Sequence, residues 1–265
     1  MKTSKIILTA IFTIVLTTSL FAQTALELLI RAEDSSDNKY CIELAKQVIA
    51  LAEKENDKGL IASANGQIAI CLMNLGQLED AENLATQITA MAESTGDPRA
   101  LYYEWSVKGS ISYQKKDYTN AILCFEKALP YSQKHNDSYY TRTVLISLVN
   151  SNLNAGNDAT TAIEYCNQAL SCPDSKRDPN SKSNILSLLA DIYYYFLDNS
   201  RKAIDYYNQA YDTNNQPDRK AQIAVSLALV HEYLGNANTA IETLQKPLNE
   251  LIGKISNTEK AKIFI

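Results

Sequence analysis

The side chains that most often carry out catalysis are scarce in this sequence. It has two histidines: His135 lies in the polar stretch KHND and His231 in an apolar-periodic stretch, and a structural or surface role is expected for each. No GxSxG, HExxH, GxGxxG or phosphate-loop pattern occurs. Acidic pairs such as Glu79–Asp80 fall in expected turns, where capping and solvation account for them. We therefore predict no catalytic, cofactor-binding or metal-binding residues, and a protein that is not an enzyme.

Cysteine is the other reactive side chain to place. Five cysteines follow residue 22, an odd number without a CxxC pair or a regular framework spacing, so a monomer must hold at least one free thiol. Three of them occupy positions where alanine would also fit, which predicts buried, small apolar side chains. A disulfide between Cys166 and Cys172 remains an open alternative, and a metal site is not expected. The five are Cys41, Cys71, Cys124, Cys166 and Cys172, of which Cys41, Cys124 and Cys166 have the alanine-like position.

Tyrosine offers stacking and hydrogen bonding, and the chain has 16 of them. Packing accounts for one member of each cluster. Adjacent residues of a helix point about 100° apart, so a triplet cannot face one core and some members must face a groove or solvent. The clusters are Tyr102–Tyr103, Tyr139–Tyr140, Tyr193–Tyr195 and Tyr206–Tyr207.

A repeat positions these residues. The phrase LAKQVIALAEKEND (44–57) returns as LATQITAMAESTGD (84–97), and the small residue that opens each copy recurs at intervals of 40, 40, 41, 41 and 37. Apolar residues every three or four positions predict that each copy is an amphipathic helix. A short polar turn separates it from a preceding helical pattern, at roughly 25–34, 61–75, 100–115, 141–155, 182–197 and 220–234. Gly76, Gly156 and Gly235 suit the positive φ at the end of those preceding helices. Isolated pairs cannot bury their apolar faces, so an all-α stack of helix pairs is predicted.

The pattern resembles the tetratricopeptide repeat more than the HEAT or armadillo repeats. The third copy has Trp105 and Gly109, the turn KKDY, and then Ala121, Phe125 and Ala128. The resemblance implies a right-handed helix-turn-helix solenoid of about six repeats plus a partial one, in units longer than the family's usual length of about 34 residues. The approximate units are 24–57, 58–97, 98–137, 138–178, 179–217, 218–256 and the partial 257–265. Similar elongated units occur in the sensor regions of Bacteroidetes-type signalling proteins.

The first 22 residues differ from the rest. Lys2 and Lys5 precede an uncharged apolar run from Ile6 to Leu20, and Ala22 suits a cleavage site. The run is shorter than the roughly 20 residues that span a bilayer, so a signal peptide over 1–22 is preferred to an uncleaved anchor, and no later segment is expected to cross a membrane. Export to the periplasm or the medium follows. Cleavage leaves 23 basic and 30 acidic side chains, a net charge of −7, which argues against nucleic acid as a partner.

The resemblance also implies that the repeat array spans residues 23–265 and that the first helices of its pairs line a concave groove. The groove candidates lack the lysine and arginine that clamp a terminal carboxylate, so they predict a neutral or basic protein or extended peptide as partner. The ending NTEKAKIFI reads as another first helix broken off, which favours a truncated relative of a sensor over a capped array. An envelope assembly scaffold and a carbohydrate-binding array are the alternatives. The candidates are Gln67, Ile70, Asn74, Tyr103, Tyr113, Gln114, Asn150, Asn154, Asp191, Tyr194, Tyr195, Gln222 and Glu232.

Overall fold

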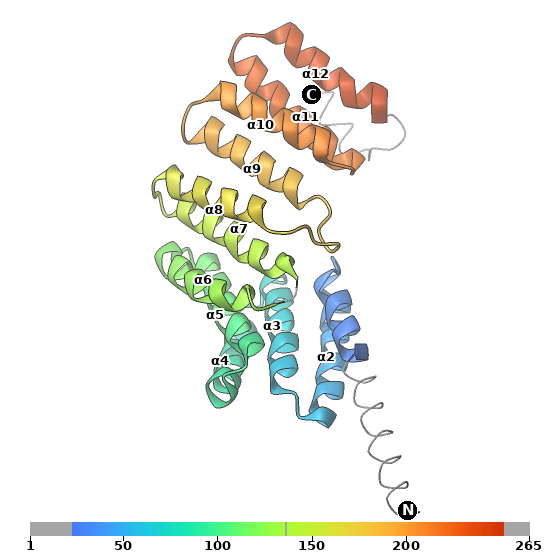
Figure 1. Cartoon of the computed structure of the whole chain (residues 1–265), viewed down its shortest axis with the longest axis vertical. Coiled ribbons are helices and arrows are strands. Elements are labelled where there is room, and N and C mark those ends of the chain that lie inside the picture. The colour runs from blue at the N-terminus through green and yellow to red at the C-terminus, as the bar shows by residue number, and fades with distance from the viewer. Residues whose placement is uncertain (1–22, 136, 252–265) are drawn as a thin grey trace, which may run out of the picture. The chain divides into compact units, whose positions relative to one another are not determined.

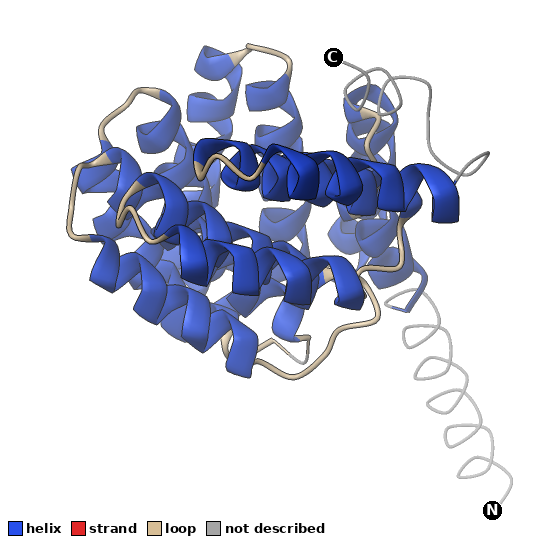
Figure 2. Cartoon of the chain, turned by 90° about the horizontal axis from the view of Figure 1, so that it is seen from above, coloured by secondary structure: helices blue, strands red, loops and turns tan. Residues whose placement is uncertain are grey.

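The computed structural model describes residues 23–135 and 137–251, and every regular element in those ranges is a helix (Figures 1 and 2). The predicted signal peptide and the partial repeat 257–265 lie outside them. After helical residues 23–33 come α2 (Asn38–Glu55), α3 (Lys58–Asn74), α4 (Leu78–Thr95), α5 (Pro98–Gln114), α6 (Tyr118–Ser132), α7 (Ser138–Asn154), α8 (Ala159–Ser171), α9 (Ser181–Tyr195), α10 (Ser200–Thr213), α11 (Pro217–Tyr233) and α12 (Ala237–Leu251).

The helices form antiparallel hairpins, as the repeat predicts. The pairs α3/α4, α5/α6, α7/α8, α9/α10 and α11/α12 each pack together across a short turn, and α2 packs against α3 (Figure 1). This confirms an all-α architecture of about six helix-turn-helix repeats. The chain divides into two compact units between Asn136 and Asp137, called unit 1 and unit 2 below. None of the described helices combines the length and apolar character that a bilayer span requires.

Aspartates fix where the helices begin. Asp57 Oδ1 accepts a hydrogen bond from the Leu60 amide at 2.9 Å, and Asp97 Oδ1 accepts one from the Arg99 amide at 2.8 Å. Asp57 and Asp97 are the aspartates that end the two copies of the repeated phrase. Some of the acidic residues therefore act as N-caps of the helices that follow. Asp37, Asp117, Asp137 and Asp158 cap α2, α6, α7 and α8 in the same way. Glu79 and Asp80, expected in a turn, instead occupy the first turn of α4. Negative side chains at a helix N-terminus stabilise the helix through its dipole.

The turns within hairpins repeat one backbone feature. Gly76, Gly156 and Gly235 follow the first helices with φ of 78°, 74° and 76°, which confirms the positive φ predicted for them. Lys116 holds the equivalent position with φ of 62°, and Asp198, one residue further beyond the end of α9, has φ of 46°. Side chains with a Cβ rarely adopt that region, so these two turns are less favourable locally than the other three.

Close helix packing depends on small residues. A Cβ on Gly109 of α5 would lie 2.8 Å from Phe125 Cε1 of α6, and one on Gly66 of α3 would lie 2.1 Å from Tyr103 Cδ1 of α5. Each glycine therefore lets an aromatic ring fill the space between two helices. The Gly109 and Phe125 pair is part of the repeat signature found in the sequence, and the structure shows that it packs one hairpin.

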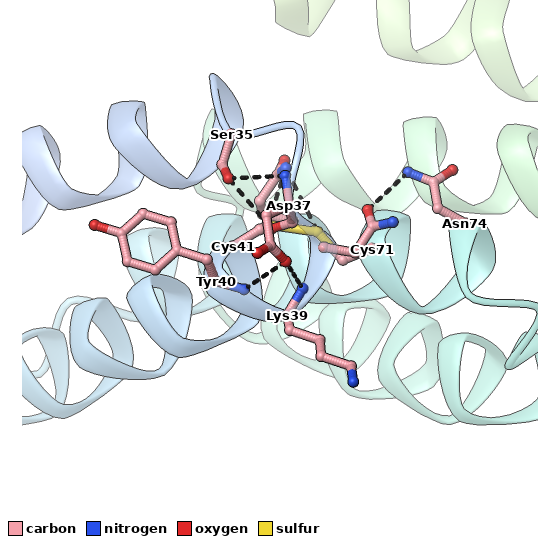
Figure 3. Close-up of a disulfide and its surroundings, with 9 residues drawn as sticks. Ser35, Asp37, Lys39, Tyr40, Cys41, Cys71 and Asn74 are labelled. Atoms are coloured by element: carbon pink, nitrogen blue, oxygen red, sulfur yellow. Dashed lines mark hydrogen bonds between the residues drawn. A yellow bond between two sulfur atoms is a disulfide. The ribbon is translucent and has the colours of Figure 1, made fainter.

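The cysteine pairing differs from the alternative that the sequence left open. Cys166 and Cys172 are free, and a disulfide instead joins Cys41 of α2 to Cys71 of α3 (Figure 3). The two cysteines are 0% and 2% exposed and face each other because α2 and α3 are packed neighbours, 30 residues apart in sequence. Sequence spacing alone does not show this, since neither cysteine lies in a recognised disulfide framework. Cys124 and Cys166 are buried, as predicted.

Candidate binding surface

Two predicted groove residues of unit 1 lie in its interior. Tyr103 is 3% exposed and Gln67 is 8% exposed. The Tyr103 ring packs on Gly66, and its hydroxyl donates a hydrogen bond to the Glu33 carboxylate. The Gln67 amide lies beside the disulfide, 3.5 Å from Cys41 Sγ. Neither side chain is placed to face a ligand, because Tyr103 packs on Gly66 of α3 and Gln67 packs beside the disulfide that joins α2 to α3.

The other unit 1 candidates do not gather into one site. Asn74 is exposed and donates from Nδ2 to Asn38 Oδ1 at 3.2 Å, at the edge of the disulfide region (Figure 3). The Tyr113 ring stands edge-on to Tyr118 at 5.3 Å between centroids. Gln114 is exposed and Ile70 is half-buried. These side chains remain candidates for contact, without a shared pocket.

In unit 2, Asp191 and Gln222 belong to a polar network across three helices. The hydroxyl of Tyr207 on α10 donates to Asp191 on α9, and Arg219 on α11 donates from Nη1 to Gln222 Oε1 at 2.9 Å. Burial raises the pKa of Asp191, while the Tyr207 hydrogen bond and the Arg219 charge oppose that shift. Gln222 and Arg219 also line a cleft of 520 Å³ at the start of α11, with Gln216, Pro217 and Asp218.

The asparagine candidates of unit 2 support their own helix. Asn154, on α7, donates from Nδ2 to the Asn150 carbonyl at 2.8 Å, an exposed contact one turn back. Asn150 is half-buried.

Three tyrosines meet on an exposed surface of unit 2. The Tyr194 ring on α9 lies edge-on to Tyr195 at 4.7 Å and to Tyr233 of α11 at 5.7 Å. Tyr195 is 67% exposed and Tyr233 is 63% exposed. We call Tyr194, Tyr195 and Tyr233, with the carboxylates of Asp198 and Glu232, the tyrosine patch. Side chains this large are seldom left so exposed in a group unless they make contact with another molecule.

The tyrosine patch has negative character. Burial raises the pKa of Tyr194, and Tyr195, Tyr233, Asp198 and Glu232 raise it further through their charges. The two carboxylates are also close to the tyrosines in the chain, since Glu232 directly precedes Tyr233 and Asp198 is three residues after Tyr195. Phe196, Leu197 and Leu234, which follow the tyrosines directly in the chain, are 51%, 41% and 46% exposed. An aromatic and apolar surface beside carboxylates suits a ligand with both apolar and cationic groups.

The structure thus brings together three of the predicted residues, Tyr194, Tyr195 and Glu232. It adds Tyr233, which is not among the predicted groove residues and stands alone in the sequence, apart from the tyrosine clusters.

The two histidines lie in different units, His135 in unit 1 and His231 in unit 2. His135 packs edge-on to Tyr102 at 5.1 Å, and His231 lies in the last turn of α11. Over residues 23–135 and 137–251, no group of three or more histidine, cysteine or acidic side chains is placed to hold a metal ion.

Comparison with known proteins places the fold. A family model of the tetratricopeptide repeat matches residues 105–135, the stretch from Trp105 on α5 to the end of the α5/α6 hairpin. No curated protein matches the chain by sequence. Solved structures do resemble it. BtubC (BKLC) from P. vanneervenii is 16% identical with a TM-score of 0.63, over 81% of this chain and 91% of that one.

Two further solved structures are larger proteins. A signal transduction ATPase with numerous domains and a tetratricopeptide repeat sensor, from Pyrococcus horikoshii, is 19% identical with a TM-score of 0.66, over 85% of this chain and 35% of that one. The apo form of the quorum sensor NprR from B. thuringiensis is 16% identical with a TM-score of 0.61, over 84% and 63%. The present chain spans less than two thirds of either. The repeat matched at residues 105–135 and the shared hairpin arrangement identify an all-α protein of tetratricopeptide-repeat fold.

Proposed function

We propose that the chain is a non-enzymatic module that binds a protein or an extended peptide, and that the tyrosine patch makes the principal contact. The observation that carries this proposal is the exposure of Tyr195 and Tyr233 beside Tyr194, whereas most other aromatic side chains of the described residues are buried or half-buried. Tyrosine supplies a large contact area at a low entropic cost, because only two side-chain torsions have to be fixed.

The chemistry of the tyrosine patch selects a basic segment. The ring faces attract an arginine or lysine side chain, an interaction of about 0.5–2 kcal/mol depending on exposure. Asp198 and Glu232 attract the same cations and repel acidic segments. The exposed Phe196 and Leu234 would cover an apolar neighbour of the basic residue. A neutral or basic extended peptide therefore fits better than an acidic one.

A sensor role at the cell envelope is the biological setting that we propose. The Pyrococcus horikoshii protein carries a tetratricopeptide repeat sensor, and NprR is a quorum sensor, so the fold serves recognition of signals elsewhere. Export is supported by the basic and apolar residues of segment 1–22. It is also supported by the Cys41–Cys71 disulfide, a cross-link that persists in oxidising compartments. Mass spectrometry of the cell-envelope fraction is expected to find a mature N-terminus at Gln23.

The binding proposal is tested with blocked, dye-labelled peptides of equal length in which glycine alternates with arginine, glutamine or glutamate. Fluorescence anisotropy is expected to rank their affinities in that order. Tyr195→Ala and Tyr233→Ala should each weaken the binding of the arginine peptide about five- to tenfold, because each substitution removes one aromatic ring. Tyr40→Ala is the matched control, since Tyr40 is a 42% exposed tyrosine of unit 1.

Two outcomes would count against the proposal. Equal affinity for the arginine and glutamate peptides would show that the surface does not select a basic ligand. Equal losses of affinity in Tyr195→Ala, Tyr233→Ala and the control Tyr40→Ala would show that the tyrosine patch is not the binding site. If a neutral oligosaccharide binds and the peptides do not, with the same dependence on Tyr195 and Tyr233, the surface serves carbohydrate stacking instead.

A further inference from the structure

A second surface, in unit 1, has the opposite chemistry to the tyrosine patch. Residues of helices α4, α5 and α6 line an open cleft of 360 Å³. Trp105, Lys108, Ser112 and Lys115 share one face of α5, because they are spaced by three and four residues. The second helices α4 and α6 form its two walls, so the cleft involves a part of the repeats that the groove prediction did not use. Its lining is Glu82, Ala85, Trp105, Lys108, Ile111, Ser112, Lys115, Asn120 and Cys124.

Lysines converge on the tryptophan of this cleft. Lys127 Nζ lies 4.2 Å and Lys108 Nζ 4.9 Å from the centroid of the Trp105 ring. Lys108 also pairs with Glu104 at 2.7 Å, and Lys115 pairs with Glu82. Within the described parts of the chain, no carboxylate lies within ion-pair distance of Lys127. Lys127 does not line the cleft itself, but it adds an uncompensated positive charge over the ring of Trp105, which does, in a protein of net charge −5.

The rest of the lining suits a side chain that is apolar along its stem. Ala85, Ile111 and Cys124 are 6%, 8% and 6% exposed and form an apolar floor. Burial raises the pKa of Cys124, so its thiol stays neutral and does not compete as an anion. The Asn120 amide donates to Ser112 Oγ at 2.7 Å, which holds the polar groups of the wall in place.

We propose that this cleft binds the carboxylate side chain of an acidic peptide segment, with Lys127 and Lys108 as its cationic partners and Trp105 as the surface on which its methylene groups lie. The ammonium groups now over the indole ring would turn to the carboxylate, exchanging a cation–π contact for a charge-assisted hydrogen bond. A protein partner with basic and acidic segments could then contact unit 2 and unit 1 through different surfaces, each selecting one charge.

Trp105 allows a direct test, because it is the only tryptophan of the chain. A blocked five-residue peptide with one glutamate among alanines is titrated into the purified protein while tryptophan emission is followed, and its glutamine twin is titrated in parallel. The glutamate peptide is expected to cause a saturable change that weakens at high salt. Lys127→Gln should weaken this binding about tenfold, the size of one charge-assisted hydrogen bond.

Four controls accompany this titration. Lys127→Arg retains the charge and should retain binding, and Lys46→Gln, at an exposed position of α2, should have no effect. Circular dichroism checks that each variant is folded. A peptide with a free terminal carboxylate and no glutamate distinguishes a side-chain ligand from a chain end, and tighter binding of that peptide would overturn the side-chain assignment. Equal responses to the glutamate and glutamine peptides, or an unchanged response in Lys127→Gln, would overturn the site.

Discussion

Arg99 joins two helix starts in unit 1. Its Nη2 lies 2.6 Å from Asp57 Oδ1 and 2.8 Å from Asp97 Oδ2. Further contacts, from Nη1 to Asp57 Oδ2 at 3.1 Å and from Nε to Asp97 Oδ1 at 3.2 Å, make both pairings bidentate. Each carboxylate also caps a helix, α3 or α5. The hydrogen bond from Arg99 is the main cause that lowers the pKa of Asp97 from its ordinary value of 3.8.

Replacing Arg99 tests this arrangement. Arg99→Ala is expected to lower the free energy of unfolding by about 1–2 kcal/mol at neutral pH, a modest figure because the side chains are partly exposed. A carboxylate whose pKa is lowered by folding adds stability that is complete above its unfolded value and lost as the pH falls through the folded value. The difference between wild type and variant, measured by urea denaturation, should therefore shrink below about pH 4. A difference that stays constant on acidification would contradict the assignment.

Gly59 gives an independent test of the same contacts. A Cβ at this position would lie 2.2 Å from Asp97 Oδ2 and 2.5 Å from Arg99 Nη2. Gly59 is the second residue of α3. Alanine is the better helix former, yet Gly59→Ala should destabilise this protein because it displaces the ion pair. In the Arg99→Ala background the same change should cost less or become stabilising. Thermal unfolding of the two single variants and the double variant measures this coupling.

At the scale of the helix and its turn, sequence patterns predict the elements better than their ends. The first helix predicted at 61–75 begins at Lys58, because the Asp57 cap starts it before the apolar periodicity does. The turn glycines were identified in three hairpins. Lys116 and Asp198 were not, since a residue with a side chain gives no sign that its φ is positive. Their conformation follows from the hairpin geometry that the repeat imposes on them.

This difference between equivalent turns predicts a stabilising substitution. Lys116 has φ of 62° where Gly76 and Gly156 have 78° and 74°. Lys116→Gly should raise the free energy of unfolding by about 0.5–1 kcal/mol, because it relieves the left-handed conformation. The reverse change, Gly156→Lys, should lower it by a similar amount. Melting temperatures of the two variants provide the measurement, and a loss of stability in Lys116→Gly would show that its side chain matters more than its backbone.

At the scale of the whole molecule, the repeat predicts the hairpin architecture. It predicts the residues of the binding surface only in part. Periodicity identifies which residues of a helix are apolar, but Gln67 and Tyr103 are polar side chains whose burial depends on contacts with other helices. Gln67 lies against Cys41 of α2, and Tyr103 packs on Gly66 of α3, a residue that was not among the groove candidates. The tyrosine patch likewise unites residues from α9 and α11 that no sequence spacing connects. Contacts between repeats therefore decide where a surface forms.

The disulfide between Cys41 and Cys71 is a covalent cross-link between α2 and α3 of unit 1. The double variant Cys41→Ala/Cys71→Ala should lower the free energy of unfolding by about 3–4 kcal/mol. The reason is that the cross-link, over a separation of 30 residues, restricts the entropy of the unfolded chain. Urea denaturation with and without reductant measures the effect. Cys166→Ala, which leaves the cross-link intact, should cost less. Equal stability of the oxidised and reduced wild-type protein would show that the cross-link contributes nothing.

The placement of the caps bears on how such an array can change in length. Asp57 and Asp97 each stand at the end of one copy of the phrase and begin the next hairpin. A genetic duplication of residues 58–97 would therefore supply the added hairpin with its own starting aspartate, and a deletion of that block would join Asp57 directly to Pro98, where Asp97 now stands. Gain and loss of whole blocks would thus leave every remaining helix start intact, whereas a breakpoint inside a phrase would not.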